Sequence, residues 1–309
     1  MNSEKETFQS KNYISKSLSY RFSQFVGFLL GARFFVAALL TFALYVSTFF
    51  LFNQDESFKS FVFDFKVHGI IFCTVLTILA GGIINQFYDL EKDSVVKPFR
   101  TRVQSFIKQK YFLYAYLGLS AISLGVAWII SHNVFIFFVV YQFFMWFYSH
   151  KLSRVLIVNN LTFVSLTLYP FFGMMVYYET FSKKVFLMAV FLFLILLCID
   201  IVKDTLTRSV DKTFGYTTIP NYFKGRNTKI ILISLLIVTM TVSMKIITKT
   251  GVAGIMAYYF AGGLFVMIFC VFLLLKASRR NNFLILSVLR LWVFVGIIAM
   301  LLNGIEHKL

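Results

Sequence analysis

Long apolar runs, separated by short polar or basic stretches, are the feature that most constrains this chain. About 20 consecutive apolar residues suffice for a helix to cross the hydrocarbon core of a bilayer. The runs therefore predict an all-α, polytopic membrane protein with about nine transmembrane helices, at residues 33–52, 67–85, 111–131, 133–149, 155–178, 184–202, 229–248, 252–275 and 283–303. The low charged fraction, 14% of residues, supports a protein embedded in the membrane, because soluble domains average about 25%.

The strongly basic character of the chain, with a formal net charge of +17, raises the question of nucleic-acid binding. Most of the 30 Lys and Arg residues, however, lie between apolar runs on one side of the predicted membrane. This distribution is typical of charges that set membrane topology, so we predict no nucleic-acid partner. The positive-inside rule places the N-terminus and the two long polar interruptions, 86–110 and 203–228, in the cytoplasm. We predict a cytoplasmic segment with a candidate interfacial helix at 1–32, a transmembrane domain at 33–309, and a bacterial inner membrane as the location.

A first polar cluster closes the second predicted span. Asn85, Asp89 and Asp93 follow one another at intervals of four residues, so on a helix they lie along one face. Acidic residues at the mouth of a membrane helix are costly unless something binds them, which makes them a functional-site hypothesis. Carboxylates one turn apart suit Mg²⁺ held together with a phosphorylated substrate. The cations just downstream suit the phosphate oxygens themselves: Lys97, Arg100 and Arg102.

A second polar cluster closes the sixth predicted span in the same way. Asp200 and Asp204 are again four residues apart, with Lys203 beside them and Asp211 and Lys212 downstream. One acidic helix end could be a structural cap. Two such ends on one membrane face, each followed by a basic stretch, favour a shared site for a divalent metal and a diphosphate.

From about residue 30 to residue 300, the sequence resembles the UbiA superfamily of intramembrane prenyltransferases. The first family motif is Asn-Asp-x-x-Asp-x-x-x-Asp, which the first cluster matches with Gln86 in place of the second-position Asp. The second motif is matched in type and spacing by Asp200, Asp211, Gly215 and Thr218, and Lys203-Asp204 resembles the Lys-Asp pair of some branches. A third likeness is Tyr148-Ser149-x-x-Leu152-x-Arg154 with Asn160. Thr207 and Val210 stand where many members carry acids.

The resemblance implies a helical bundle around a central cavity and transfer of a prenyl group from a polyprenyl diphosphate to a lipophilic acceptor. It implies Mg²⁺ held by five carboxylates, with Asn85 as a further ligand or as the residue that orients Asp89: Asp89, Asp93, Asp200, Asp204 and Asp211. The implied substrate-binding residues lie near the same membrane face: Lys97, Arg100, Arg102, Tyr148, Arg154, Lys203 and Lys212. An aromatic, quinone-type precursor is the first expectation for the acceptor, because such acceptors are frequent in the family.

Several alternatives stay open from the sequence alone. The acceptor could be a glycerol-phosphate lipid or a tetrapyrrole, or the protein could be a terpene cyclase of the same superfamily that needs no acceptor. Gln86 also leaves open a non-catalytic protein that binds prenyl lipids. A transporter fits less well, because transporters usually keep coupling charges near the membrane midplane, whereas these acids lie at one face. Mg²⁺-dependent release of diphosphate would distinguish an enzyme from a transporter and from a non-catalytic prenyl-lipid-binding protein.

Overall fold

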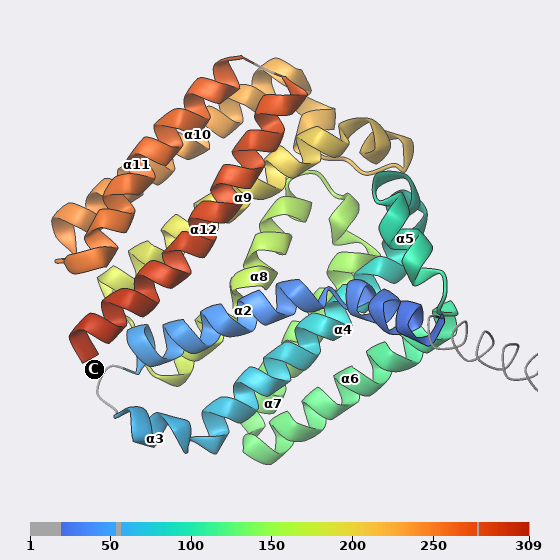
Figure 1. Ribbon diagram of the computed structural model, residues 1–309, viewed down its shortest axis with the longest axis horizontal. Coiled ribbons are helices and arrows are strands. Elements are labelled where there is room, and N and C mark those ends of the chain that lie inside the picture. The colour runs from blue at the N-terminus through green and yellow to red at the C-terminus, as the bar shows by residue number, and fades with distance from the viewer. Residues whose placement is uncertain (1–19, 54–56, 277, 309) are drawn as a thin grey trace, which may run out of the picture. The chain divides into compact units, whose positions relative to one another are not determined.

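The computed structural model describes residues 20–53, 57–276 and 278–308, and nearly all of these are helical (Figure 1). A helical segment at 20–31 comes first. It is followed by α2 (Phe34–Ser47) with the π-helical turn η1 (Thr48–Phe52), α3 (Phe58–Val62), α4 (Phe65–Val96), α5 (Pro98–Gln104), α6 (Gln109–Ile130), α7 (His132–His150), the 3₁₀ turn η2 (Leu152–Arg154), α8 (Val158–Tyr177), α9 (Lys183–Thr213), α10 (Ile219–Lys249), α11 (Gly254–Leu275) and α12 (Arg279–Lys308). The prediction of an all-α fold is confirmed.

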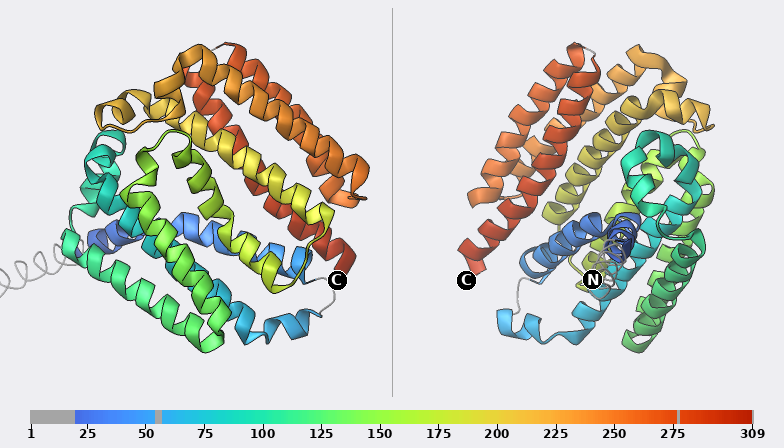
Figure 2. Two further views of the ribbon diagram at one scale, coloured as in Figure 1. Left: turned by 180° about the vertical axis from the view of Figure 1, so that it is seen from behind. Right: turned by 45° about the vertical axis from the view of Figure 1, so that its right-hand side comes forward.

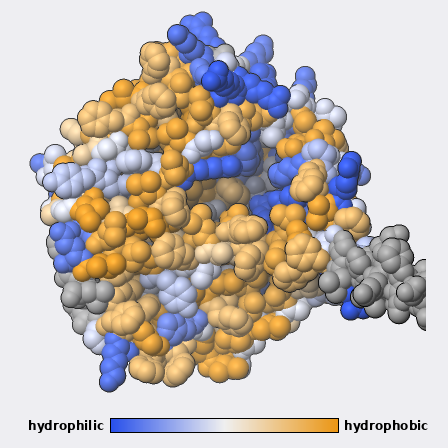
Figure 3. Space-filling model, in the orientation of Figure 1, coloured by the Kyte–Doolittle hydropathy of each residue, from blue (hydrophilic) through white to orange (hydrophobic). Residues whose placement is uncertain are grey.

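Eight of the described helices are long and apolar enough to cross a membrane. Each corresponds to a predicted span, and the remaining predicted span, 133–149, forms helix α7 but is not among the eight. The polar and aromatic side chains of α7 lower its hydropathy relative to the aliphatic helices. Hydrophobic side chains make up most of the face seen in Figure 3, whereas hydrophilic ones gather where α11 meets α12. These observations agree with an integral membrane protein of about nine spans.

Two helices continue through stretches that the sequence predicts to be polar interruptions. Helix α4 runs past residue 85 to Val96, and α9 runs past residue 202 to Thr213, so 86–110 and 203–228 are largely helical and not loops. Ion pairs between residues about one turn apart, Lys97 with Asp93 and Lys203 with Asp200, stabilise a helix outside the apolar core as well as inside it. Hydropathy therefore marks where the membrane core ends and not where the helix ends.

The chain divides into two compact units, each of which is described here by itself. The first consists of residues up to Leu39 together with Phe72–Gln142, and the second of Leu40–Ile71 together with Phe143–Leu309. The boundary at residue 32 between an N-terminal segment and a transmembrane domain stays a prediction.

In the second unit, α9 packs against α8, α10 and α12, and α11 packs against α10 and α12. Figures 1 and 2 show α9 to α12 running side by side. Buried aliphatic and thioether side chains fill the space between them, including Ile195, Leu236, Met267 and Ile285. Helix α9 therefore has its position fixed by three neighbours, which matters because it carries one of the polar clusters.

In the first unit, α4 lies close to the turn between the 20–31 segment and α2. Ile83 packs with Ala32 and Phe112 in a small buried cluster. On the same helix, a Cβ added at Gly82 would lie only 2.8 Å from the carbonyl oxygen of Ala32. The glycine thus permits the close approach of two backbones. Earlier in α4, the Thr77 hydroxyl lies 3.0 Å from the Ser123 hydroxyl and joins α4 to α6.

We expect Gly82→Ala to destabilise the protein by about 1–3 kcal/mol, because the new methyl group would push against backbone that cannot rotate away. Gly118 on α6 is the matched control, since a Cβ added there meets no atom of the described residues within 4 Å. Gly118→Ala should leave stability unchanged or raise it by up to about 1 kcal/mol through helix propensity. Thermal unfolding of the purified protein in detergent measures both. Equal melting temperatures for the two variants would contradict the close approach at Gly82.

Candidate active site

The polar cluster of the second unit forms a stripe along α9. Asp200, Lys203, Asp204, Thr207 and Asp211 share one helix face, because steps of three and four residues return to the same side. All three carboxylates are buried. The Lys203 ammonium donates to Asp200 and lies 3.8 Å from Oδ1 of Asp204. The Thr207 hydroxyl donates to Oδ2 of Asp211 at 2.7 Å.

Asn160, in the first turn of α8, holds two of these carboxylates. Its side-chain Nδ2 donates hydrogen bonds of 2.8 Å to Oδ2 of Asp200 and 2.8 Å to Oδ2 of Asp204. The sequence points to Asn160 only as part of a family-like stretch and not as a site residue. Its role arises from the packing of α8 on α9, which no spacing within one helix reveals. The available signal was the pair of amides, Asn159 and Asn160, near the start of an apolar membrane run.

Tyr148 reaches the edge of this cluster through an aromatic neighbour. The Lys203 ammonium lies 5.0 Å from the centroid of the Phe163 ring, a cation–π distance. The ring of Tyr148 contacts the same phenyl ring, with centroids 6.1 Å apart. Phe163, which sequence reasoning did not select, therefore connects the predicted residue Tyr148 to the lysine.

Arg154 and Lys212 lie at the periphery of the cluster. The Arg154 guanidinium stacks over the ring of Tyr216 at 5.3 Å, and the Arg154 carbonyl accepts a hydrogen bond of 3.2 Å from the amide of Thr217. Arg154 thereby ties the end of η2 to the segment after α9. Lys212 is exposed in the last turn of α9, about 100° around the helix from Asp211. The structure does not bring Lys212 onto the carboxylate stripe.

In the first unit, α4 carries all three residues of the other predicted cluster. The Asn85 amide donates a hydrogen bond of 2.8 Å to Oδ2 of Asp89. One turn further on, the Lys97 ammonium forms an ion pair of 2.9 Å with Oδ1 of Asp93, which is buried. The amide of Asn85 thus orients Asp89, one of the two roles expected for it.

Three cations gather near the start of α5 in the same unit. The Arg100 guanidinium donates a hydrogen bond of 2.6 Å to the carbonyl of Leu30. Burial lowers the pKa of the Lys97 ammonium and of the Arg100 guanidinium, and the positive charge of Arg33 lowers both pKa values further, whereas Asp93 opposes these shifts. Arg33 sits at the turn before α2 with a φ of 54°, a left-handed conformation. Sequence reasoning did not place Arg33 among the site residues.

Gln86, which stands where the family motif has Asp, is buried against other elements of the first unit. A Cβ added at Gly31 would lie 2.6 Å from Oε1 of Gln86. Gln104 lies beside it, and with its amide oxygen turned toward the nearby donors it accepts hydrogen bonds from Arg100 Nε at 2.8 Å and from the Gly31 amide at 3.2 Å. Gln86 is therefore buried beside Gly31 and Gln104, while Arg102 on α5 is exposed.

Asp200 and Asp204 approach one another through shared partners, Asn160 and Lys203. Within the part of the chain that the structure describes, no three or more His, Cys, Asp or Glu side chains come close enough together to hold a metal ion. Mg²⁺ is usually bound through one or two carboxylates together with substrate phosphates and waters. The pair Asp200 and Asp204 fits a Mg²⁺ ion whose coordination a phosphorylated substrate completes.

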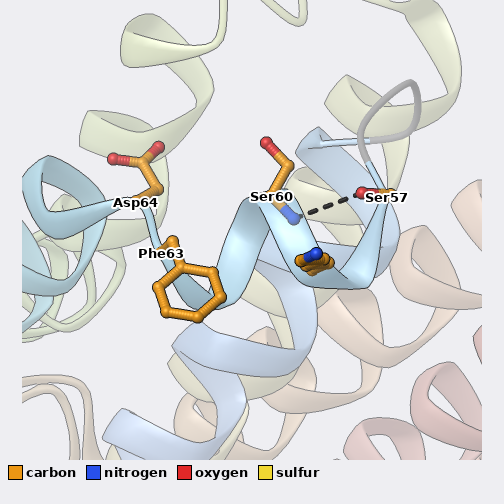
Figure 4. Close-up of a pocket in the computed structure, with 5 residues that line it drawn as sticks. Ser57, Ser60, Phe63 and Asp64 are labelled. Atoms are coloured by element: carbon orange, nitrogen blue, oxygen red, sulfur yellow. Dashed lines mark hydrogen bonds between the residues drawn. The ribbon is translucent and has the colours of Figure 1, made fainter.

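A pocket of about 570 Å³ lies at α3, and the predicted site residues are not among those that line it (Figure 4). It is lined by Ser57, Lys59, Ser60, Phe63 and Asp64. Two of its polar side chains cap the first turns of α3 and α4. The Ser57 hydroxyl accepts a hydrogen bond of 3.2 Å from the amide of Ser60, and the Asp64 carboxylate accepts one of 3.1 Å from the amide of Val67. We assign these contacts to helix capping.

Comparison with known sequences gives a consistent family. The profile of the UbiA prenyltransferase family matches residues 57–294. Digeranylgeranylglyceryl phosphate synthase of Thermococcus gammatolerans is 27% identical over 247 residues, which cover 77% of this chain and 87% of the relative. The enzyme of the same name from Thermococcus kodakarensis is 25% identical over 246 residues, which cover 78% of this chain and 87% of the relative.

Solved structures share the fold. One, from work on digeranylgeranylglyceryl phosphate synthase in membranes, has a TM-score of 0.70 at 18% identity and covers 92% of this chain and 99% of its own. A UbiA homologue from Archaeoglobus fulgidus bound to GPP and Mg²⁺ has a TM-score of 0.62 at 14% identity and covers 89% of this chain and 99% of its own. The predicted fold and prenyltransferase activity class are confirmed. Since the family profile spans most of its length, the chain belongs to the UbiA prenyltransferase family.

Proposed function

We propose that this prenyltransferase transfers a prenyl group from a prenyl diphosphate to a glycerol-phosphate lipid in a Mg²⁺-dependent reaction. The acceptor class rests on the two Thermococcus relatives, both of which are named digeranylgeranylglyceryl phosphate synthase. Their names favour this alternative over the aromatic acceptor that family frequency suggested first. The donor and the metal ion rest on the Archaeoglobus homologue that binds GPP and Mg²⁺, together with the acidic clusters of this chain.

The observation that carries the donor site is the α9 stripe, in which buried carboxylates one turn apart stand beside a lysine. In the reaction the allylic carbon–oxygen bond breaks and the diphosphate leaves with the electron pair. The acceptor hydroxyl oxygen attacks the allylic carbon and gives its proton to the released diphosphate or to water. Mg²⁺, when bound, supplies positive charge to the diphosphate oxygens as their negative charge grows. Each unit carries its own candidate set of ligands for such an ion: Asp200, Asp204 and Asp211 in the second unit, and Asn85, Asp89 and Asp93 in the first.

The cations of the chain have a separate task, which is to bind phosphate oxygens directly. Lys203 in the second unit and Lys97 and Arg100 in the first are the candidates, and we add Arg33 because its charge acts on both neighbours. Preorganised cations aimed at a leaving group stabilise the charge that develops on it. The Phe163 ring beside Lys203 can exclude water from the same place.

We also propose that the basic helix ends face the cytoplasm, because most Lys and Arg residues lie on that side of the predicted topology. A cysteine introduced at Arg280 should react with an impermeant thiol reagent only after the cytoplasmic side is opened, whereas one at Lys249 should react in intact cells. The three native cysteines are buried and give little background. The reverse labelling pattern would overturn this orientation. A bacterial inner membrane stays a prediction.

The function is tested with purified protein in lipid nanodiscs, supplied with geranylgeranyl diphosphate and Mg²⁺. We expect diphosphate release that requires Mg²⁺ and a geranylgeranylglyceryl phosphate acceptor, with the prenylated lipid identified by mass spectrometry. Release that instead requires an aromatic acid would restore the first expectation for the acceptor. Release without any acceptor would indicate a cyclase. No release with any donor would contradict the proposal.

Among the donor-binding candidates, we expect Arg100→Leu to raise the donor KM about 10–100-fold, because hydrogen bonds to charged groups contribute about 1.5–3 kcal/mol. Arg102→Leu is the matched control on the same short helix, where the side chain is exposed. It should change the donor KM by no more than about three-fold, as expected for a solvent-exposed charge. Initial rates at varied donor concentration measure both. Equal effects of the two substitutions would contradict the assignment of Arg100.

A further inference from the structure

We propose that Asn160 is a positioning residue that fixes the carboxylates of Asp200 and Asp204 for a divalent cation. The inference rests on the proposed Mg²⁺-dependent function and deepens it. Asn160 is fully buried, at 0% exposure, and its amide lies between two acids that are one helical turn apart. Nothing in the spacing of the acids themselves determines which of their oxygens faces the substrate.

The hydrogen bonds of Asn160 divide the four carboxylate oxygens into two pairs. A side-chain amide has two N–H donors, and Asn160 directs its Nδ2 at Oδ2 of Asp200 and at Oδ2 of Asp204, each at 2.8 Å. The Oδ1 atoms of both acids are left facing Lys203. The terminal torsion of an aspartate is otherwise broad. The clamp therefore presents one oxygen from each acid on the side of the Lys203 ammonium, which is the side that we assign to the divalent cation.

The orientation of the amide follows from its surroundings. Turning it over would place its oxygen against two carboxylate oxygens, which no hydrogen bond could stabilise. In the orientation observed, Oδ1 of Asn160 is buried and has no hydrogen-bond partner among the residues that the structure describes. Leaving a buried acceptor unsatisfied is unfavourable, so the two donors are the favourable contribution of this residue. A residue with the same shape but no donors would fill the site and leave the acids unclamped.

The backbone before α8 is strained in a way that fixes this position. Ile157 has a φ of 64°, which is a genuine outlier for a β-branched residue. Such strain persists where the surrounding structure holds it, often at functional sites. Two residues later, Oδ1 of Asn159 accepts a hydrogen bond of 2.7 Å from the backbone amide of Asn160. The turn before α8 sets Asn160 against α9, whereas the Asn159 hydrogen bond is local to the start of α8.

The test compares Asn160→Leu with Asn159→Leu in the full-length protein. Asn159 is the matched control because it is adjacent and buried, and its side chain accepts from a backbone amide and does not contact an acid among the described residues. Electron paramagnetic resonance measures the affinity for Mn²⁺ in the presence of inorganic diphosphate, so it reports on the metal site without catalytic turnover. We expect Asn160→Leu to raise the Mn²⁺ dissociation constant and the half-saturating Mg²⁺ concentration about 10–100-fold, as for other residues that orient metal ligands. Asn159→Leu should lower thermal stability and leave both values within about two-fold.

Two further variants separate the ways in which this inference can fail. Asn160→Ser keeps one donor and should give a smaller increase than the leucine variant, and it carries the test if the leucine variant does not fold. Asp200→Asn reports on the proposed function: if it leaves Mn²⁺ binding and diphosphate release intact, the function assigned to this cluster is wrong. If Asp200→Asn abolishes both while the Asn160 variants behave like Asn159→Leu, the function stands and the positioning role is overturned.

Discussion

Asp200→Asn is expected to lower the rate of Mg²⁺-dependent diphosphate release by about a thousand-fold or more, which corresponds to about 4 kcal/mol in the activation barrier. The carboxylate is buried, accepts from Asn160 and pairs with Lys203. The amide keeps the size of the side chain but removes one negative charge and one cation-binding oxygen. The NH₂ group of the new asparagine would also point its N–H donors at the donors of Asn160 or Lys203, where the aspartate oxygen had accepted a hydrogen bond. Coupled measurement of released diphosphate over a range of Mg²⁺ concentrations gives the effect.

The matched control is Asp64→Asn, which changes the same functional group at a helix start in the same unit. Asp64 accepts hydrogen bonds from the backbone amides of Lys66 and Val67 at 3.1 Å each, and Asn is as effective as Asp at such a cap. Activity should therefore remain within about two-fold of the wild type. If Asp200→Asn kept more than a tenth of the activity while folding normally, the α9 stripe would not be the metal-binding element.

The sequence predicts the helices well and predicts their ends poorly. Apolar runs of membrane length mark the core of every span, because a helix is the structure that satisfies its own backbone in lipid. The ends of α4 and α9 extend further, since charge pairs such as Lys97 with Asp93 replace apolar packing there. As a result Asp211, expected in a polar interruption, lies in the last turns of α9 and shares a face with Asp200.

Sequence spacing predicts that two site residues lie close together only where both are on the same helix. Asp200 and Asp204 can be paired from the sequence because they are four residues apart. Asn160 reaches them across 40 and 44 residues through the contact between α8 and α9, and Arg33 reaches the Lys97 region from the turn before α2. These residues depend on tertiary packing and could not be assigned from the pattern. Gln86 differs from these residues, because it occupies a family-motif position but is buried against neighbouring elements of its own unit.

Lys203 supplies the positive charge opposite the carboxylates of the α9 stripe, and its removal is expected to lower stability. Lys203→Met keeps the length of the side chain and removes its charge, which leaves two buried carboxylates with Asn160 as their donor. Removing one member of a fully buried ion pair costs about 3–5 kcal/mol. Because the Lys203 side chain is 41% exposed, we expect a smaller loss of about 2 kcal/mol in the free energy of unfolding. Thermal unfolding in detergent without divalent ions measures this loss.

Adding Mg²⁺ should then stabilise Lys203→Met more than the wild type. A ligand that binds only the folded state raises the unfolding free energy according to its affinity, and two carboxylates without a competing ammonium attract a divalent cation more strongly. Lys212→Met is the control, since that lysine is exposed and lies off the stripe, and it should match the wild type with and without Mg²⁺. Diphosphate release should fall in Lys203→Met even at saturating Mg²⁺, because the ammonium that we propose to contact the leaving group is gone. If Lys203→Met were as stable as Lys212→Met, and if Mg²⁺ stabilised the two variants equally, Lys203 would not neutralise these acids.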